Sequence, residues 1–185
     1  ATESVIAPTS PYSISKLGAD LFLQSMSSVR GFPCSIIRPS NCFGEGQYTY
    51  RIIPKAILFL LSGRKFPLEG GGKAMKSFMH VENLCAAVEL ILAKKPQGEI
   101  YNCGPEQPIS MATLVNRVCD AMGKNFDENV DIVPAREFED SIYWLNSEKI
   151  KNELGWSTSV SLEEGLERSV CWVKMYKDQL ERSSN

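Results

Sequence analysis

The chain has 185 residues, enough for one domain with a sizeable core or for two very small domains. Hydrophobic residues make up 43% of the sequence and charged residues 23%. The formal net charge is −2 at pH 7, so no bulk basic field points to a nucleic acid or an anionic membrane as partner. The longest apolar run, AILFLLSG, is far too short to cross a bilayer.

Cysteine and histidine usage bears on metal binding and on the cellular compartment. The sequence has six cysteines and a single histidine, His80, and no two cysteines form a C-x-x-C pair. This pattern argues against a zinc site. Most of the cysteines fall in apolar periodic stretches, where a small buried thiol is the expected role. We therefore expect reduced thiols, no bound metal and a cytoplasmic location.

The first half of the chain alternates between helical and extended patterns. Pro11 suits the first turn of a long periodic helix, and Pro54 suits the first turn of a second one. In order, we expect a helix at 11–29, a strand at 33–39, a loop at 41–50, a helix at 51–63 and two short extended pieces around a glycine turn at 65–81.

The second half continues the alternation. Ser110 is a helix N-cap candidate, and Gly123 marks the end of the same helix. In order, we expect a helix at 82–95, a strand at 98–104, a helix at 110–123, a strand at 130–134 and two helices at 147–155 and 161–180. There are no internal repeats, and the pattern as a whole predicts an α/β fold.

Two features resemble functional motifs but favour structural roles. The run GGGK at 70–73 has Pro67 where a phosphate loop needs glycine and Ala74 where it needs Ser or Thr, so we interpret it as a tight turn. His80 lies between a Met and a Val in an extended run, with no second histidine in the chain. We expect it to be a packed or hydrogen-bonded structural residue.

A chemical motif stands at the first predicted helix. The stretch SPYSISK places Tyr12 and Lys16 four positions apart, on the same face of the first helical turns. Taken alone, this spacing also arises by chance, and Tyr12 could simply pack at a helix start. A short motif of this kind needs support from the rest of the chain.

Several further stretches supply that support. SPYSISK is followed in order by IIRPSNCFGEGQ, RIIPKAI, LEGGGKAMKSFMHVENLCAAVELIL, GEIYNCGPEQPISMATLV and AREFEDSIYWLNSEKIKNELGW. In this order and spacing, which runs from about residue 3 to residue 175, the chain resembles the extended short-chain dehydrogenase/reductase family. Within it, the resemblance is to the NAD-dependent nucleotide-sugar epimerases and 4,6-dehydratases.

The resemblance implies a fold and a division into domains. It predicts the C-terminal part of a doubly wound Rossmann-type sheet plus a smaller α/β substrate-binding lobe. Residues 1–45 would end the NAD-binding domain, and residues 46–185 would mainly form the lobe, with some segments returning to the Rossmann domain. No glycine fingerprint follows a strand in this sequence, so we expect a C-terminal fragment that is inactive alone and does not bind the cofactor usefully.

The resemblance also assigns roles near the cofactor. Tyr12 would be the general base that takes the proton of the sugar 4-hydroxyl, with Lys16 beside it as a second catalytic and cofactor-binding residue. A free tyrosine has a pKa near ~10, and a neighbouring ammonium favours the phenolate. Pro39 and Ser40 would lie near the nicotinamide of NAD or NADP, and Asn41 would contact the substrate. A simple turn remains the alternative for Ser40 and Asn41.

Cationic residues would bind the diphosphate of a nucleotide-diphosphate sugar. The resemblance points to Lys76 and Arg136, and less directly to Arg51. Asp140, or Glu139 beside it, would hold ribose hydroxyls. Each of these could instead be an ordinary surface charge. One departure is Asn83, which stands where the family usually has aspartate.

Several alternatives stay open at this point. The sequence does not separate a 4,6-dehydratase (a lyase) from a 4-epimerase (an isomerase) or a decarboxylase, and it names neither the sugar nor the base. The family implies polysaccharide biosynthesis and a homodimer formed through the helix that carries Tyr12 and Lys16. The alternative from a different class is a non-catalytic nucleotide-sugar-binding or structural module of the same fold.

Overall fold

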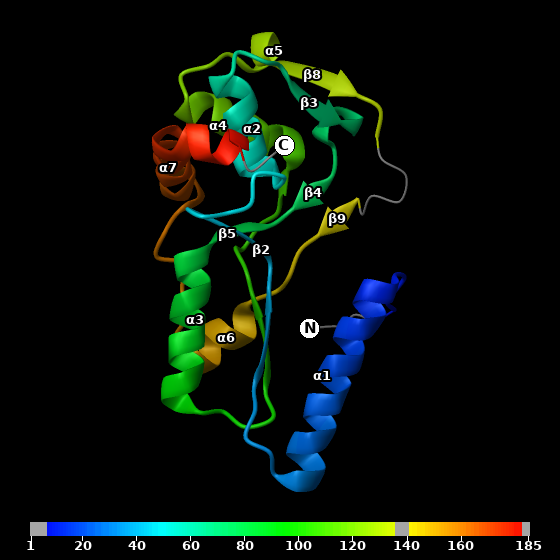
Figure 1. Ribbon diagram of the computed structural model, residues 1–185. Coiled ribbons are helices and arrows are strands. Elements are labelled where there is room, and N and C mark those ends of the chain that lie inside the picture. Colours follow the sequence, from blue (N-terminus) through cyan, green and yellow to red (C-terminus); the bar gives the residue numbers. More distant parts are fainter. Residues whose placement is uncertain (1–6, 136–140, 183–185) are drawn as a thin grey trace.

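The computed structural model describes residues 7–135 and 141–182 (Figure 1). Its helices are α1 (Pro11–Arg30), α2 (Ile52–Leu61), α3 (Val81–Lys94), α4 (Met111–Ala121), α5 (Phe126–Asn129), α6 (Glu148–Leu154) and α7 (Leu162–Arg182), with one 3₁₀ turn, η1 (Gly70–Gly72). Its strands are β1 (Ile36–Pro39), β2 (Asn41–Phe43), β3 (Phe66–Glu69), β4 (Met75–Lys76), β5 (Phe78–His80), β6 (Ile100–Cys103), β7 (Ile109–Ser110), β8 (Val130–Val133) and β9 (Ile142–Tyr143). The predicted α/β fold is confirmed.

Parallel pairing builds one half of the structure. β1 pairs with β6 and β2 pairs with β5, both in parallel. The partner changes at Ser40: its backbone N–H donates to the Cys103 carbonyl at 2.8 Å, and the next N–H, that of Asn41, donates to the Ser77 carbonyl at 3.2 Å. Helices α3 and α6 lie beside these strands in Figure 1. Their packing buries a core formed by Met79, Ala87, Tyr101, Cys103, Ile150, Leu154 and Trp156.

The other half has its own core. β3 pairs with β8 in parallel, while β4 pairs with β7 antiparallel and with β9 in parallel. Helices α2, α4 and α7 pack together at the top of Figure 1. The larger buried cluster lies among them and includes Phe43, Ile53, Ile57, Leu60, Phe66, Leu68, Leu114, Val115, Val118, Leu166, Val170 and Val173. The exact division into domains stays a prediction.

Serine side chains cap the first turns of two helices, and the cap at Ser110 was predicted. Ser10 caps α1 in a reciprocal capping box with Ser13, and Ser110 caps α4 by accepting from the Thr113 N–H. The glycine turn is also confirmed, because Gly70–Gly72 all have positive φ. A side chain at Gly72 would meet the backbone nitrogen of Ala112 at 2.5 Å, so this close approach requires glycine.

The loop predicted at 41–50 was wrong at its start, because Asn41–Phe43 forms β2. A three-residue strand leaves little alternating pattern in the sequence, and this one exists because β5 lies beside it. Strands β7 and β9 and the single turn α5 were not predicted either. These elements have four residues or fewer, so tertiary pairing and packing define them.

Helix α1 stands apart from both cores. None of its residues is buried, and it carries large exposed apolar side chains. These side chains are Tyr12, Ile14, Leu21, Phe22 and Val29. Large exposed apolar patches are typical of surfaces that contact other molecules. In the described part of the chain, no helix is both long and apolar enough to span a membrane.

Asn83 has a structural role that explains its identity. It is 1% exposed, and its side-chain oxygen accepts from the backbone N–H groups of Ser159 and Val160 at 2.9 and 3.0 Å. Its side-chain N–H donates to the Val160 carbonyl at 2.8 Å, and its own carbonyl accepts from the Trp156 indole at 2.9 Å. An ionised aspartate could not donate to Val160. The departure from the family pattern therefore matches the local hydrogen bonding.

This network predicts that Asn83→Asp is destabilising. The change replaces a donor with a carboxylate oxygen that faces the Val160 carbonyl in a buried site. The free energy of unfolding should fall by at least ~1–3 kcal/mol, measured by urea denaturation at neutral pH. Asn152→Asp, at an exposed position of α6, is the matched control and should have little effect. Equal stability of Asn83→Asp and wild type would contradict the assignment.

Candidate active site

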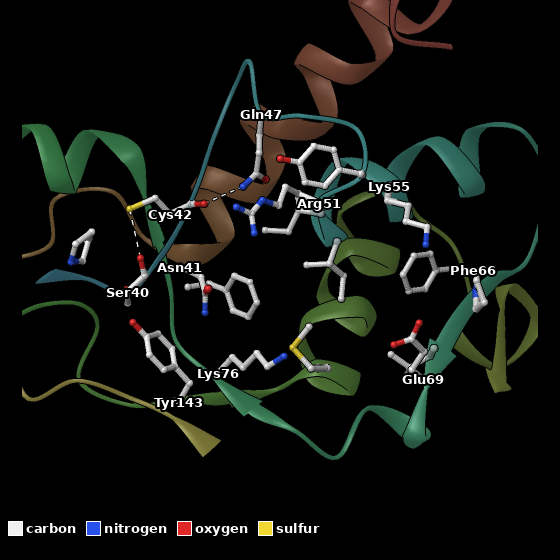
Figure 2. Close-up of a pocket in the computed structure, with 18 of the residues that line it drawn as sticks. Ser40, Asn41, Cys42, Gln47, Arg51, Lys55, Phe66, Glu69, Lys76 and Tyr143 are labelled. Carbon is white, nitrogen blue, oxygen red and sulfur yellow. Dashed lines mark hydrogen bonds between the residues drawn. The ribbon is translucent and has the colours of Figure 1, made fainter. Parts of the chain in front are cut away.

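A cleft of about 1080 Å³ lies where the two halves meet. Figure 2 shows Ser40, Asn41 and Tyr143 toward one end, Phe66 and Glu69 toward the other, and Arg51 and Lys76 between them. The lining also includes Tyr12, Pro39, Cys42, Gln47, Tyr50, Lys55 and Met111. The cleft thus collects residues from α1, from the ends of parallel strands and from the second half of the chain. Ligands bind at such strand ends in open α/β sheets.

The structure places Tyr12 and Lys16 on one helix, one turn apart. Pro11 is the first residue of this helix, and Tyr12 therefore lies in the first turn. The Tyr12 side chain is 73% exposed and forms part of the cleft wall. Lys16 is exposed one turn further on and is not among the lining residues that the structure describes.

Pro39, Ser40 and Asn41 follow one another along the cleft wall where β1 passes into β2. The Asn41 side-chain amide donates to the Ser77 carbonyl at 3.1 Å, which orients its carboxamide. Ser40 is 4% exposed, and its hydroxyl has no hydrogen-bond partner within the described residues. A buried hydroxyl without a protein partner at a cleft wall is a position where a polar ligand group can bind.

Two of the predicted cations reach the cleft. Arg51 is the N-cap residue of α2, and its guanidinium lies 5.5 Å from the centre of the Tyr50 ring. Lys76 is the second residue of β4, paired with Tyr143 of β9. Arg136, Glu139 and Asp140 lie outside the described residues, so their roles stay predictions. Within the described ranges, no group of three or more His, Cys, Asp or Glu side chains could hold a metal ion.

Several cleft residues were not identified from the sequence. Tyr143 comes from the two-residue strand β9, and burial, with nearby Tyr12 and Cys42, raises the pKa of its phenol above the ordinary value of 10. Gln47 donates from its side chain to the Cys42 carbonyl at 2.8 Å. Tyr50, Lys55 and Glu69 also line the cleft. Except for Tyr50, they lie within the stretches that carry the resemblance, but no role was predicted for them, because only the folded chain shows that they share one cleft.

A charged clasp fixes the start of the loop that follows β2. We define it as Glu45, His80, Glu82 and Arg168. Arg168 Nε donates to Glu45 at 2.8 Å, and the terminal guanidinium nitrogens donate to both oxygens of Glu82. The clasp joins this loop, which carries Gln47 and Arg51 into the cleft, to α3 and α7.

His80 completes the clasp as a structural residue, as predicted. It is 1% exposed, and its Nδ1 accepts from the Glu82 backbone N–H at 3.4 Å, which makes it the N-cap of α3. The hydrogen therefore lies on Nε2, which donates to Glu45 at 3.1 Å. Burial alone would raise the pKa of Glu45, but hydrogen bonds from its backbone, Arg168 and His80 outweigh it and lower that pKa.

The fold and the cleft define a class of protein. A parallel α/β sheet, with strand ends that meet a helix carrying Tyr-x-x-x-Lys, is the arrangement of the extended short-chain dehydrogenases/reductases that act on nucleotide sugars. The model of the family described as GDP-mannose 4,6 dehydratase matches residues 2–169. The chain belongs to this family.

Known proteins agree with this assignment. The chain is 35% identical to the dTDP-D-glucose 4,6-dehydratase of Mus musculus over 172 residues, which cover 90% of this chain and 48% of that protein. The crystal structure of the Bacillus anthracis dTDP-glucose 4,6-dehydratase in complex with NAD superposes with a TM-score of 0.90 at 31% identity, covering 98% of this chain and 58% of that one. For the Thermotoga maritima UDP-glucose 4-epimerase with UDP-glucose, the TM-score is 0.86 at 25% identity, covering 92% and 55%. The chain thus spans about half the length of these proteins.

The clasp predicts a specific acid dependence of stability. Because the pKa of Glu45 is lowered in the folded state, its contribution is present above the ordinary glutamate value of 4.5 and is lost as the pH falls through the lowered value. Arg168→Gln should reduce the free energy of unfolding at pH 7 and flatten its decline in acid. Urea denaturation across this pH range measures both.

Lys65→Gln provides the control for this measurement. Lys65 forms a single exposed ion pair with Asp131 at 3.3 Å, and such pairs contribute little. The Lys65→Gln variant should therefore have nearly the same free energy of unfolding as the wild type at pH 7, and the same decline of that free energy in acid. The role given to the clasp would be refuted if the free energy of unfolding of Arg168→Gln declined in acid as steeply as that of the wild type.

Proposed function

We propose that the whole protein that contains this chain is an NAD-dependent enzyme that oxidises a nucleotide-diphosphate sugar at C4, as a 4,6-dehydratase or a 4-epimerase. The observation that supports this most directly is the single cleft that contains Tyr12, the strand-end residues Pro39–Asn41 and the cations Arg51 and Lys76. The family match and the similar solved structures point to the same class of reaction. Between the two reactions, the described cleft holds no deciding residue.

In this proposal, Tyr12 is the general base. Its phenolate oxygen takes the proton of the sugar 4-hydroxyl as the carbonyl forms at C4, which is the role of a positioned side chain within hydrogen-bond reach. Lys16 follows one helical turn later and supplies a positive charge on the same side of α1. A positive charge near a phenol favours its ionised form. Lys16 would also contact the cofactor ribose.

The cleft also fits the nicotinamide of NAD. The buried hydroxyl of Ser40, which has no partner among the described residues, can exchange a hydrogen bond with a ligand amide. Pro39, immediately before it, offers an apolar surface at the end of β1. When bound, NAD would supply the hydride acceptor for the sugar C4 position. Ser40 and Pro39 would orient it in the cleft.

Arg51 and Lys76 would hold the diphosphate. They reach the middle of the cleft from different elements, α2 and β4, so two positive charges can contact the two phosphates (Figure 2). The Asn41 carboxamide, oriented by Ser77, would contact the substrate on the side of Tyr12. Arg136 and Asp140 keep their predicted roles at the diphosphate and the ribose.

The exposed face of α1 would be covered in a homodimer. Its apolar side chains include Ile14, Leu21, Phe22 and Val29, which recur at helical spacing along the whole helix. Burying these side chains against a second helix would stabilise the dimer, because removing apolar surface from water is favourable. Pairing of two such helices would bury them and would hold Tyr12 and Lys16 on a rigid element.

The first test of the proposal is Tyr12→Phe in the whole protein. This change removes the proton acceptor and keeps the ring, so turnover should fall by roughly 10²–10⁴-fold while nucleotide-sugar binding changes little. Steady-state kinetics and calorimetry measure the two quantities. Tyr48→Phe is the matched control, since Tyr48 is equally exposed at 73% and lies outside the cleft lining. Near-normal turnover of Tyr12→Phe would favour a non-catalytic nucleotide-sugar-binding module.

The second test concerns the diphosphate. Lys76→Ala and Arg51→Ala should each weaken binding of a nucleoside diphosphate by roughly tenfold or more, because each removes a charge-assisted contact. The effect should shrink at high salt. Isothermal titration calorimetry at two salt concentrations measures it. Lys94→Ala, on an exposed part of α3, should bind as wild type does, and unchanged affinity in both cleft variants would exclude this part of the proposal.

A further inference from the structure

The cleft contains one acidic side chain among its cations. Arg51, Lys55 and Lys76 line it together with Glu69, which is the only carboxylate among the described lining residues. A carboxylate repels a diphosphate and would weaken binding if it faced the phosphates. A carboxylate in a cleft that binds an anion can still accept hydrogen bonds from an uncharged part of the ligand, in addition to its contacts within the protein.

The position of Glu69 identifies that part, if the ligand is the nucleotide sugar of the proposed function. Figure 2 shows Glu69 and Phe66 at the end of the cleft opposite Ser40 and Tyr143, with Arg51 and Lys76 between. Tyr12 lies near Tyr143, as its influence on the Tyr143 phenol shows. With the sugar at Tyr12 and the diphosphate at the two cations, the nucleoside lies against β3 and Glu69.

The surroundings of Glu69 favour the base over the ribose. Phe66, Pro67 and Leu68 of the same strand line the cleft beside it, so the carboxylate is set against an apolar surface. A flat heterocyclic ring fits such a surface, and a few polar groups at its edge then set specificity. Each carboxylate oxygen accepts two hydrogen bonds, so Glu69 can keep protein contacts and still bind a ligand.

A carboxylate only accepts hydrogen bonds, which selects among bases. The guanine edge presents two adjacent donors, N1–H and the 2-amino group, and both match the two oxygens of one carboxylate. Uracil and thymine present a single N3–H flanked by two carbonyl oxygens, so the second carboxylate oxygen would face an acceptor. A site built for donors rejects a ligand that leaves its polar groups unpaired. We propose that Glu69 is a specificity-determining residue that makes this protein prefer guanine nucleotides to uracil and thymine nucleotides.

This preference sets the chain apart from similar proteins whose names specify dTDP-D-glucose or UDP-glucose. The test measures the dissociation constants of GDP, IDP, UDP, dTDP and dGDP for the whole protein by calorimetry. GDP should bind roughly tenfold or more tightly than UDP and dTDP, given what a bidentate base contact contributes. IDP lacks the 2-amino group and should lie between GDP and UDP, while dGDP should match GDP.

Glu69→Gln is the decisive variant. An amide presents one donor and one acceptor, which matches the N3–H and O4 of uracil, so the variant should lose the preference for GDP and gain affinity for UDP. Glu89→Gln removes the same charge at an exposed position of α3 and should keep the wild-type order. Comparing ratios of affinities cancels the general gain that any anion receives from a lost negative charge.

The outcomes separate this inference from the proposed function. Equal affinities of the wild type for GDP, UDP and dTDP, or an unchanged order in Glu69→Gln, would overturn the role of Glu69 while nucleotide binding stands. Weak binding of dGDP and dTDP alongside equal binding of GDP and UDP would assign Glu69 to the ribose hydroxyls, and would also overturn it. Failure of every nucleoside diphosphate to bind would overturn the proposed function and this inference with it.

Discussion

The change of strand partner at Ser40 holds the two halves of this structure together. Up to Pro39 the chain pairs with β6, and from Asn41 it pairs with β5. The two successive backbone N–H groups that make the change donate to the carbonyls of Cys103, at the end of β6, and of Ser77, the residue just before β5. Since strand ends in open α/β sheets leave backbone and side chains at an accessible edge, this point is also where the cleft begins. The same hydrogen bonds thus position both cores and the residues proposed to bind cofactor and substrate.

Local chemistry explains why the helices were predictable and several strands were not. The caps at Ser10 and Ser110 and the apolar spacing of each helix are encoded within a few neighbouring residues. β2, β7 and β9 have two or three residues each, and their sequences carry no periodic pattern of their own. These strands form because they pair with segments that are distant in sequence. Their own residues therefore do not predict them.

The same distinction applies to the cleft. Tyr12, Pro39, Ser40, Asn41, Arg51 and Lys76 were identified because ordered motifs surround them, and all of them line one cleft. Tyr143 and Glu69 lie within two of the stretches that carry the resemblance, AREFEDSIYW and LEGGGK, but no role in the cleft was predicted for either of them. Asn83 shows the opposite case. The sequence has asparagine where the family usually has aspartate, and the structure explains this because the Asn83 side chain must donate a hydrogen bond to the Val160 carbonyl.

The clasp between Glu45 and Arg168 has a consequence for the order of folding. Glu45 and Arg168 are 123 residues apart in sequence, and the free energy of this partly exposed ion pair is too small to offset the chain entropy lost in closing so long a loop. The contact therefore requires both α7 and the β2–β5 pair to be in place already. Contacts of this range slow folding and form after local ones. We expect the helices and both cores to assemble first, and the cleft to acquire its final shape as the last event on the folding pathway.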